Sequence, residues 1–274
     1  MPDVSLDQTP EGWNTVAEEY ERVMEPLTTE FSEEALRLTG VKPRERILDV
    51  AAGSGSLALS AARAGVDVVA IDFSPQMVKR LRFRLERENL ANATAEVMDG
   101  QALKFPGDTF DATFSVLGLM FFPERAKGFA EMFRVLRPGG RAAVIGWAGG
   151  GFRFSQFLTR VTETAIPDFP PLKPPTGSEL QDPERFKSEM ENANFKQVRV
   201  HTVRRTWNAP SPEWLWEHAR GYSPAVTAIF EKLDRLGPEM INRTRTLFLE
   251  LLQRELGSAP LRLERAAHIC IGVK

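Results

Sequence analysis

The chain has 274 residues, of which 42 % are hydrophobic and 26 % charged, and its 35 basic and 37 acidic side chains leave a formal net charge of −2. This balance is typical of a globular protein with a sizeable core and gives no indication of a nucleic-acid partner. Cys270, the only cysteine, excludes an internal disulfide and a cysteine-based zinc site. The first residues contain no basic or apolar stretch, and no apolar run approaches the ~20 residues of a membrane span, so we expect a cytoplasmic protein without a membrane span.

Two amphipathic helices open the predicted fold, over residues 13–24 and 27–38, and the second ends at Gly40. Short apolar runs then alternate with amphipathic segments. The runs are predicted strands at "ERILDVA", "VDVVAIDF", "ATAEVMD", "FDATFSVLG" and "RAAVIGWA". The connecting helices are predicted at 55–64, from the N-cap Ser74 to about residue 90, and at 123–137 before a turn at "RPGG". This alternation predicts a mainly parallel sheet that is covered on both faces.

The pattern changes after Ala148. A helix at 154–164 precedes an irregular proline-rich segment, "IPDFPPLKPP". The remaining predicted elements are a helix at 183–193, a strand at "KQVRVHTVRRTW", two or three helices over 211–256 and a strand at "AAHICIGVK". We therefore expect an α/β core at 41–148 that is completed by 183–207 and 261–274. Residues 1–40 would cover its site, and 149–182 with 208–260 would form a helical lid for the substrate.

Acidic side chains end the first three predicted strands, at Asp49, Asp72 and Asp99. Ligands of such sheets bind at the carboxyl ends of the strands, so these carboxylates are expected to share a site. The spacing Gly53-x-Gly55-x-x-Ala58 fits a loose dinucleotide fingerprint, which leaves an NAD(P)-dependent oxidoreductase open. Three carboxylates are nevertheless a poor environment for a pyrophosphate. They suit S-adenosylmethionine better, because its ammonium, sulfonium, ribose diol and adenine amine are cationic or hydrogen-bond donors.

Four motifs resemble, in order, those of class I S-adenosylmethionine-dependent methyltransferases: "LDVAAGSGSLA", "AIDFSPQMV", "VMDGQALKFPGDTFDATFS" and "RVLRPGG". Their style is closest to the ubiquinone and menaquinone branch. The resemblance implies a Rossmann-like, doubly wound seven-stranded sheet, with S-adenosylmethionine as cofactor and S-adenosylhomocysteine as product. It implies methyl transfer to an O, N or C atom of a small acceptor, with aromatic and lipophilic molecules as candidates. A methyltransferase-like protein that binds without turnover is a further alternative.

The resemblance also implies a set of cofactor-binding residues. Asp72 would accept hydrogen bonds from the ribose hydroxyls and Asp99 from the adenine amine, while Phe73 and Met77 would form apolar walls. The full expected set is Tyr20, Asp49, Ala51, Gly53, Gly55, Asp72, Phe73, Met77, Asp99, Gly100, Gln101 and Val116. Ala51 stands where many members of the family have a glycine, and we expect its methyl group to fit only at a negative φ.

Methyl transfer mainly requires alignment and the exclusion of water, and a base helps when the acceptor is a phenol, an acidic carbon or a protonated amine. Trp214, His218 and Tyr222 fall at i, i+4 and i+8 and would share one helix face. His218 is therefore the candidate catalytic residue, with a packed or surface histidine as the alternative. The segments "LMFFPE" and "GFRFSQF" are candidates for lining an apolar substrate pocket, or else belong to the core. No acidic metal cluster is evident, so we expect no metal.

Overall fold

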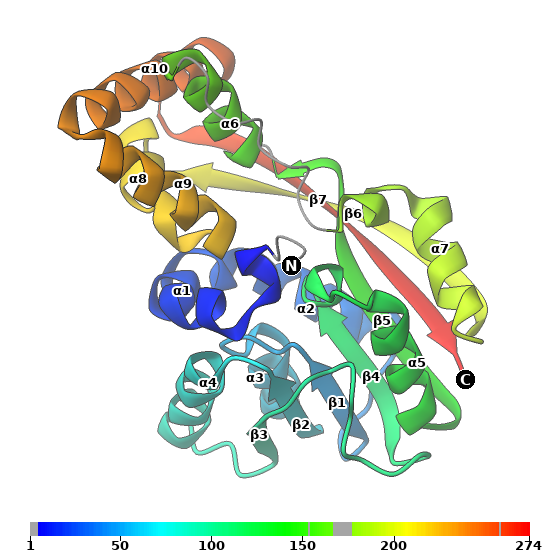
Figure 1. The fold of residues 1–274 in the computed structure, drawn as a ribbon. Coiled ribbons are helices and arrows are strands. Elements are labelled where there is room, and N and C mark those ends of the chain that lie inside the picture. The colour runs from blue at the N-terminus through cyan, green and yellow to red at the C-terminus, as the bar shows by residue number, and fades with distance from the viewer. Residues whose placement is uncertain (1–4, 153, 167–176, 258) are drawn as a thin grey trace.

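The computed structural model describes residues 5–152, 154–166, 177–257 and 259–274. Its centre is a seven-stranded sheet in the order β3-β2-β1-β4-β5-β7-β6, with helices around it (Figure 1). The strands are β1 (Arg46–Val50), β2 (Asp67–Asp72), β3 (Ala93–Val97), β4 (Phe110–Val116), β5 (Leu136–Phe152), β6 (Lys196–Ala209) and β7 (Leu261–Val273). Strands β1 to β5 pair in parallel, and β7 runs antiparallel to both β5 and β6. The expected mainly parallel, seven-stranded sheet is confirmed.

The helices begin and end where the local sequence indicates. They are α1 (Pro10–Val23), α2 (Glu25–Thr39), α3 (Ser56–Arg63), α4 (Pro75–Arg87), α5 (Arg125–Val135), α6 (Phe154–Ala165), α7 (Pro183–Asn192), α8 (Pro212–Glu217), α9 (Pro224–Leu236) and α10 (Pro238–Leu256), with 3₁₀ turns η1 (Leu6–Gln8), η2 (Leu119–Phe121), η3 (Ser178–Gln181) and η4 (Ala219–Gly221). The Ser74 hydroxyl accepts a hydrogen bond from the Met77 amide (3.2 Å) and caps α4, and Gly40 ends α2 at a φ of 64°.

The expected turn at "RPGG" needs correction, and most of the expected proline-rich segment lies outside the described residues. The "RPGG" segment is not a turn before the strand but a bulge within β5, because the pairing with β4 jumps from Phe110–Leu136 to Ala112–Arg141. Gly139 adopts a φ of 79° there, which glycine tolerates at low cost. The proline-rich segment 166–175 lies outside the described residues beyond Ile166.

The buried apolar side chains form two large clusters. The first fills the space around β1 to β5 and includes Phe31, Ile47 and Phe114. The second joins α6 and α8 to α10 to the outer ends of β6 and β7, and it includes Phe157 from the segment "GFRFSQF". Figure 1 shows these helices gathered at one end of the molecule, beyond the other strands, with α1 beside them. We call this second cluster and its helices the helical group. Its helices fall within the expected lid segments, but the cluster also includes Val23, Met24 and Leu27, and the division into a core and a lid stays a prediction.

Two further properties concern the described part of the chain alone. None of its helices combines the length and the apolar character that crossing a membrane requires. Nor does it bring together three or more histidine, cysteine or acidic side chains in a way that could hold a metal ion.

Candidate cofactor site

A cavity of about 320 Å³ lies at the carboxyl ends of β1, β2, β3 and β4, bordered by η1 and α1. Its lining consists of Gln8, Pro10, Trp13, Tyr20, Ala51, Gly53, Asp72, Phe73, Met77, Met98, Asp99, Gly100, Gln101, Val116, Leu117, Gly118, Phe121, Phe122 and Pro123. Ten of the twelve residues expected to bind the cofactor are among them, so the structure brings that set together. The two that do not line the cavity are Asp49 and Gly55.

The loop between β1 and α3 uses its glycines in two different ways. Gly53 adopts a φ of 56°, and an added Cβ there would meet nothing within 4 Å, so the loop leaves open space beside this residue. Gly55 adopts a φ of 110°, and an added Cβ would lie 2.4 Å from Leu81 Cδ1 on α4. Gly55 is therefore required for close packing behind the cavity, whereas Gly53 forms part of the cavity surface.

Ala51 corrects the expectation of a negative φ. Its φ is 56°, in the left-handed region, which costs a non-glycine residue about 1–2 kcal/mol. The methyl group fits because Gly118, at the end of β4, has no side chain: an added Cβ on Gly118 would lie 2.5 Å from the Ala51 Cβ. Leu117 also adopts a positive φ, of 54°, and both residues line the cavity. Backbone strain therefore gathers at this point of the site.

Asp72 is buried at the end of β2 and holds the loop. Its Oδ2 accepts a hydrogen bond from the Gly53 amide (2.9 Å), and its Oδ1 accepts one from the Ser74 amide (2.8 Å). Burial raises the pKa of Asp72 to about 6, while the two amide hydrogen bonds act in the opposite direction. A carboxylate offers about four lone-pair sites, so Asp72 keeps acceptor capacity for a ligand's hydroxyl groups.

Asp49 lies behind the loop and is 1 % exposed. Neither of its carboxylate oxygens has a hydrogen-bond partner within the described part of the chain. Burial and the charge of Asp72 raise the pKa of Asp49 to about 8, and the backbone amide of Ala58 acts in the opposite direction. The raised pKa favours the protonated form of Asp49, and this residue does not line the cavity.

Two hydrogen bonds orient the side chains of Asp99 and Gln101 in the cavity lining. The Asp99 carboxylate accepts from the Gln101 amide (2.8 Å), and the Gln101 Oε1 accepts from the Glu124 amide (2.8 Å). Gly100, between Asp99 and Gln101, packs closely against Phe122: an added Cβ would lie 2.6 Å from the Phe122 ring, so a side chain does not fit there. We refer to Asp72, Asp99 and Gln101 together as the polar wall.

The apolar part of the lining, which we call the apolar wall, consists of Pro10, Trp13, Leu117, Phe121 and Phe122. Phe121 and Phe122 come from the segment "LMFFPE", which was a candidate for lining an apolar pocket, whereas sequence reasoning missed Pro10 and Leu117. Trp13 packs edge-on against Tyr20 and Phe121, with ring centroids 5.5 and 5.2 Å apart. Its Nε1 donates to the Asp7 carbonyl (2.8 Å), and the Asp7 carboxylate accepts from the Ala225 amide of α9 (3.0 Å). The sequence signal for Trp13 was helical periodicity over 13–24, which does not distinguish a core face from a cavity wall.

The structure does not bring His218 to this cavity. Because α8 ends at Glu217 and η4 follows, Trp214, His218 and Tyr222 do not share one continuous helix face as expected. The His218 ring is half-buried and stacks on Trp214 at 4.2 Å between centroids, and its Nδ1 lies 2.8 Å from the Trp214 carbonyl oxygen. Tyr222 is buried in the helical group. A catalytic role for His218 stays a prediction.

Comparisons with known proteins identify related sequences. A family model described as a methyltransferase domain matches residues 47–140. A demethylmenaquinone methyltransferase from Renibacterium salmoninarum is 35 % identical over 174 residues, which cover 58 % of this chain and 71 % of that protein. An uncharacterized protein from Mycobacterium tuberculosis is 38 % identical over 141 residues, or 52 % of this chain; the match spans 49 % of that relative's length.

Solved structures agree on the fold. The phosphoethanolamine N-methyltransferase 2 of Haemonchus contortus, in complex with phosphomonomethylethanolamine and S-adenosylhomocysteine, matches 89 % of this chain and 52 % of its own, with a TM-score of 0.53 and 20 % identity. The strand order, the motifs and the match that covers 71 % of the demethylmenaquinone methyltransferase agree with one another. The chain belongs to the class I S-adenosylmethionine-dependent methyltransferases, whose cofactor is S-adenosylmethionine.

Proposed function

We propose that this protein transfers the methyl group of S-adenosylmethionine to an O, N or C atom of a small apolar acceptor. The observation that supports this most directly is that one cavity combines the acceptors of the polar wall with the aromatic and aliphatic side chains of the apolar wall. The polar wall offers acceptors for a nucleoside, and the apolar wall favours an acceptor molecule with few charges.

The polar wall and its neighbours fit the cofactor. Asp72 would accept hydrogen bonds from the ribose hydroxyls, Asp99 and Gln101 would face the adenine edge, and Phe73 with Met77 would enclose the ring. The open space at Gly53 would receive the methionine part. When bound, the cofactor supplies a methyl group that is already activated on a sulfonium.

The rest of the cavity would then align the acceptor and exclude water. Trp13 and Phe121 pack on each other in the cavity lining and would exclude water from the apolar part of the site. Tyr20 also lines the cavity, and burial with the charges of Glu25 and Asp72 raises the pKa of its hydroxyl. The Tyr20 hydroxyl therefore stays neutral and would donate a hydrogen bond at the reacting end of the site.

A nicotinamide-dependent oxidoreductase is the second candidate, because of the glycine spacing. A pyrophosphate is bound by free amides of such a loop at a helix N-terminus. Here the Gly53 amide is bonded to the Asp72 carboxylate, and the Gly55 amide donates to the Ala52 carbonyl (3.0 Å). Two amides are thus already used, and a carboxylate lies beside them, which disfavours a dinucleotide.

Thermal unfolding with saturating S-adenosylhomocysteine, and in parallel with NADH, tests the cofactor. A ligand at ~100 times its Kd stabilises the folded state by about 2.7 kcal/mol, a rise in Tm of several degrees for a chain of this size. We expect the rise with S-adenosylhomocysteine alone. A rise with NADH alone would favour the oxidoreductase, and ligand-free protein that responds to neither would contradict the proposal.

The acceptor class is tested by incubating the protein with S-adenosylmethionine and matched pairs of small molecules. Each pair contains a neutral phenol, quinol or amine and its carboxylated analogue. We expect S-adenosylhomocysteine and a methylated product, detected by mass spectrometry, from neutral members of the pairs. Turnover confined to the carboxylated members would contradict an apolar acceptor. Tight cofactor binding with no turnover of any member would favour a non-catalytic protein.

A further inference from the structure

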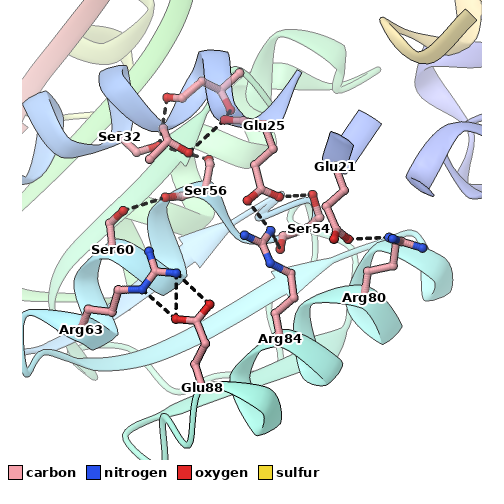
Figure 2. A network of polar contacts seen from close by, with 12 residues as sticks. Glu21, Glu25, Ser32, Ser54, Ser56, Ser60, Arg63, Arg80, Arg84 and Glu88 are labelled. Atoms are coloured by element: carbon pink, nitrogen blue, oxygen red, sulfur yellow. Dashed lines mark hydrogen bonds and ion pairs between the residues drawn. The ribbon is translucent and has the colours of Figure 1, made fainter. Parts of the chain in front are cut away.

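A buried polar network outside the cavity links the loop between β1 and α3, which we call the cofactor loop, to α2 and α4 (Figure 2). Glu25, the first residue of α2, is 4 % exposed, accepts a hydrogen bond from the Ser54 hydroxyl and forms an ion pair with Arg84 of α4. Arg84 also donates to the Ser54 carbonyl oxygen (3.0 Å). Neither Glu25 nor Arg84 lines the cavity. Glu25 reaches the cavity through its charge, which acts on Tyr20, and both residues reach the loop through their contacts with Ser54.

Ser54 lies in the part of this loop where the backbone has the greatest conformational freedom. It lies between Gly53 and Gly55, two positions with positive φ and large conformational freedom. The network contacts Ser54 at both its hydroxyl and its carbonyl, which restricts side chain and backbone together. Ser54 itself is 1 % exposed, so these contacts form away from water, where they are stronger.

A second contact from α2 reaches the other side of Gly55. The hydroxyl groups of Ser32 and Ser56 are 3.1 Å apart and buried. Glu25 and Ser32 are seven residues apart, about two helical turns, so they lie on the same face of α2. One helix face therefore holds the loop at Ser54 and at Ser56, and Figure 2 shows both contacts along α2.

The same carboxylate connects the loop to the helix beside the cavity. Glu25 follows Met24, the C-cap of α1, and α1 carries Trp13 and Tyr20 into the cavity lining. We propose that Glu25 and Arg84 are positioning residues: through Ser54 they fix the cofactor loop in its binding conformation and couple it to the placement of α1. The inference rests on the proposed function, because it assigns this loop to cofactor binding.

A purely structural ion pair would behave differently. The cost of removing two charges from water roughly offsets their attraction, so replacing both members of a buried pair by neutral residues of similar shape often changes stability little. A positioning role therefore predicts weaker ligand binding in a variant whose melting temperature is nearly unchanged. A structural role predicts unchanged affinity, whatever the change in melting temperature.

The test is the double variant Glu25→Gln/Arg84→Met, which leaves no unpaired buried charge. Its Kd for S-adenosylhomocysteine is measured by calorimetry well below the melting temperature of the ligand-free protein. We expect this Kd to rise about tenfold or more, because a displaced cofactor loop would no longer be aligned with the ligand. The matched control is Arg63→Met/Glu88→Gln, since that pair (2.7 Å) joins α3 to α4 but is more exposed and does not contact the loop. We expect the control to bind like the wild type.

Two single variants sharpen the result. Arg84 donates to both Glu25 and Ser54 from its Nη1, and Arg84→Lys keeps the charge on a shorter, flexible side chain that does not fix a donor at this place, so we expect an intermediate affinity. Ser54→Ala removes the hydroxyl bonded to Glu25 and should weaken binding in the same direction as the double variant. A double variant with wild-type affinity overturns the inference; if that variant does not fold, wild-type affinity in Ser54→Ala overturns it. Wild-type protein that does not bind S-adenosylhomocysteine overturns the proposed function instead.

Discussion

The two walls of the cavity are built in different ways. The polar wall stands on strand ends and the glycine loop, where backbone amides of Gly53, Ser74 and Gln101 fix each carboxylate. The apolar wall depends on packing between side chains far apart in the chain, such as Trp13 and Phe121. We therefore expect changes to the polar wall to alter ligand affinity first, and changes around the apolar wall to alter stability first.

The largest effect is expected from Asp72→Asn. The amide would turn an N–H group toward a backbone N–H of Gly53 or Ser74 and would lose an acceptor for the ligand. We expect at least about a 100-fold increase in the Kd for S-adenosylhomocysteine, close to 2.7 kcal/mol, measured by calorimetry. Asp67→Asn, at the exposed opposite end of β2, is the matched control. Unchanged affinity in Asp72→Asn would remove the polar wall from the binding site.

A smaller effect, on stability, is expected from Asp7→Asn beside the apolar wall. Burial raises the pKa of Asp7 from 3.8 to about 6, while the hydrogen bond from Ala225 acts in the opposite direction. The stabilisation of the protonated folded form is complete below pH 4 and is lost as the pH rises through 6, at a cost of up to about 3 kcal/mol. Asparagine keeps an acceptor for Ala225 and does not titrate, so the variant should melt above the wild type at pH 8 but not at pH 4. Equal differences at both pH values would contradict this account.

The affinity for S-adenosylhomocysteine should also depend on pH. Protonation of Asp72 turns one acceptor oxygen into an O–H donor, and its pKa is raised to about 6 by burial, against the amide hydrogen bonds from Ser74 and Gly53. We expect affinity to be about tenfold weaker at pH 5 than at pH 7, measured by calorimetry. Asp49, with its pKa near 8, keeps its proton through this window. Asp72→Asn should abolish the dependence; a persistent dependence would assign it to another group.

The smallest effect is expected from His218→Ala. The ring stacks on Trp214 within the helical group, so affinity for S-adenosylhomocysteine and turnover should stay within about twofold of the wild type. His201→Ala, also half-buried and outside the cavity lining, is the matched control. Slower turnover with unchanged affinity in His218→Ala alone would restore the catalytic hypothesis and make the helical group part of the reacting site.

The sheet and much of the polar wall could be predicted because their residues have a backbone meaning. Alternating strands and helices limit the topology to few arrangements, and an acidic residue at a strand end has a predictable place. Asp72 and Gly53 are of this kind, and both line the cavity as expected.

The remaining features depend on contacts that the local sequence does not record. The positive φ of Ala51 is acceptable because Gly118 makes room for its methyl group. The chain turns at η4 where α1 approaches closely, since an added Cβ on Gly221 would lie 2.1 Å from Glu19 Cγ. Helical spacing at Trp214 and His218 gave no signal of that approach, so a single continuous helix face was the wrong expectation.

The position of β7 has a consequence for how the chain is made. Strand β7 lies between β5 and β6, and β6 pairs with no other strand in the described sheet. During synthesis β6 is therefore translated before β7, its pairing partner. It stays unpaired while α8, α9 and α10 are translated. Unpaired edges invite association with other chains. Basic side chains along β6, such as Lys196, Arg199 and Arg204, oppose pairing of the unpaired strand with another chain.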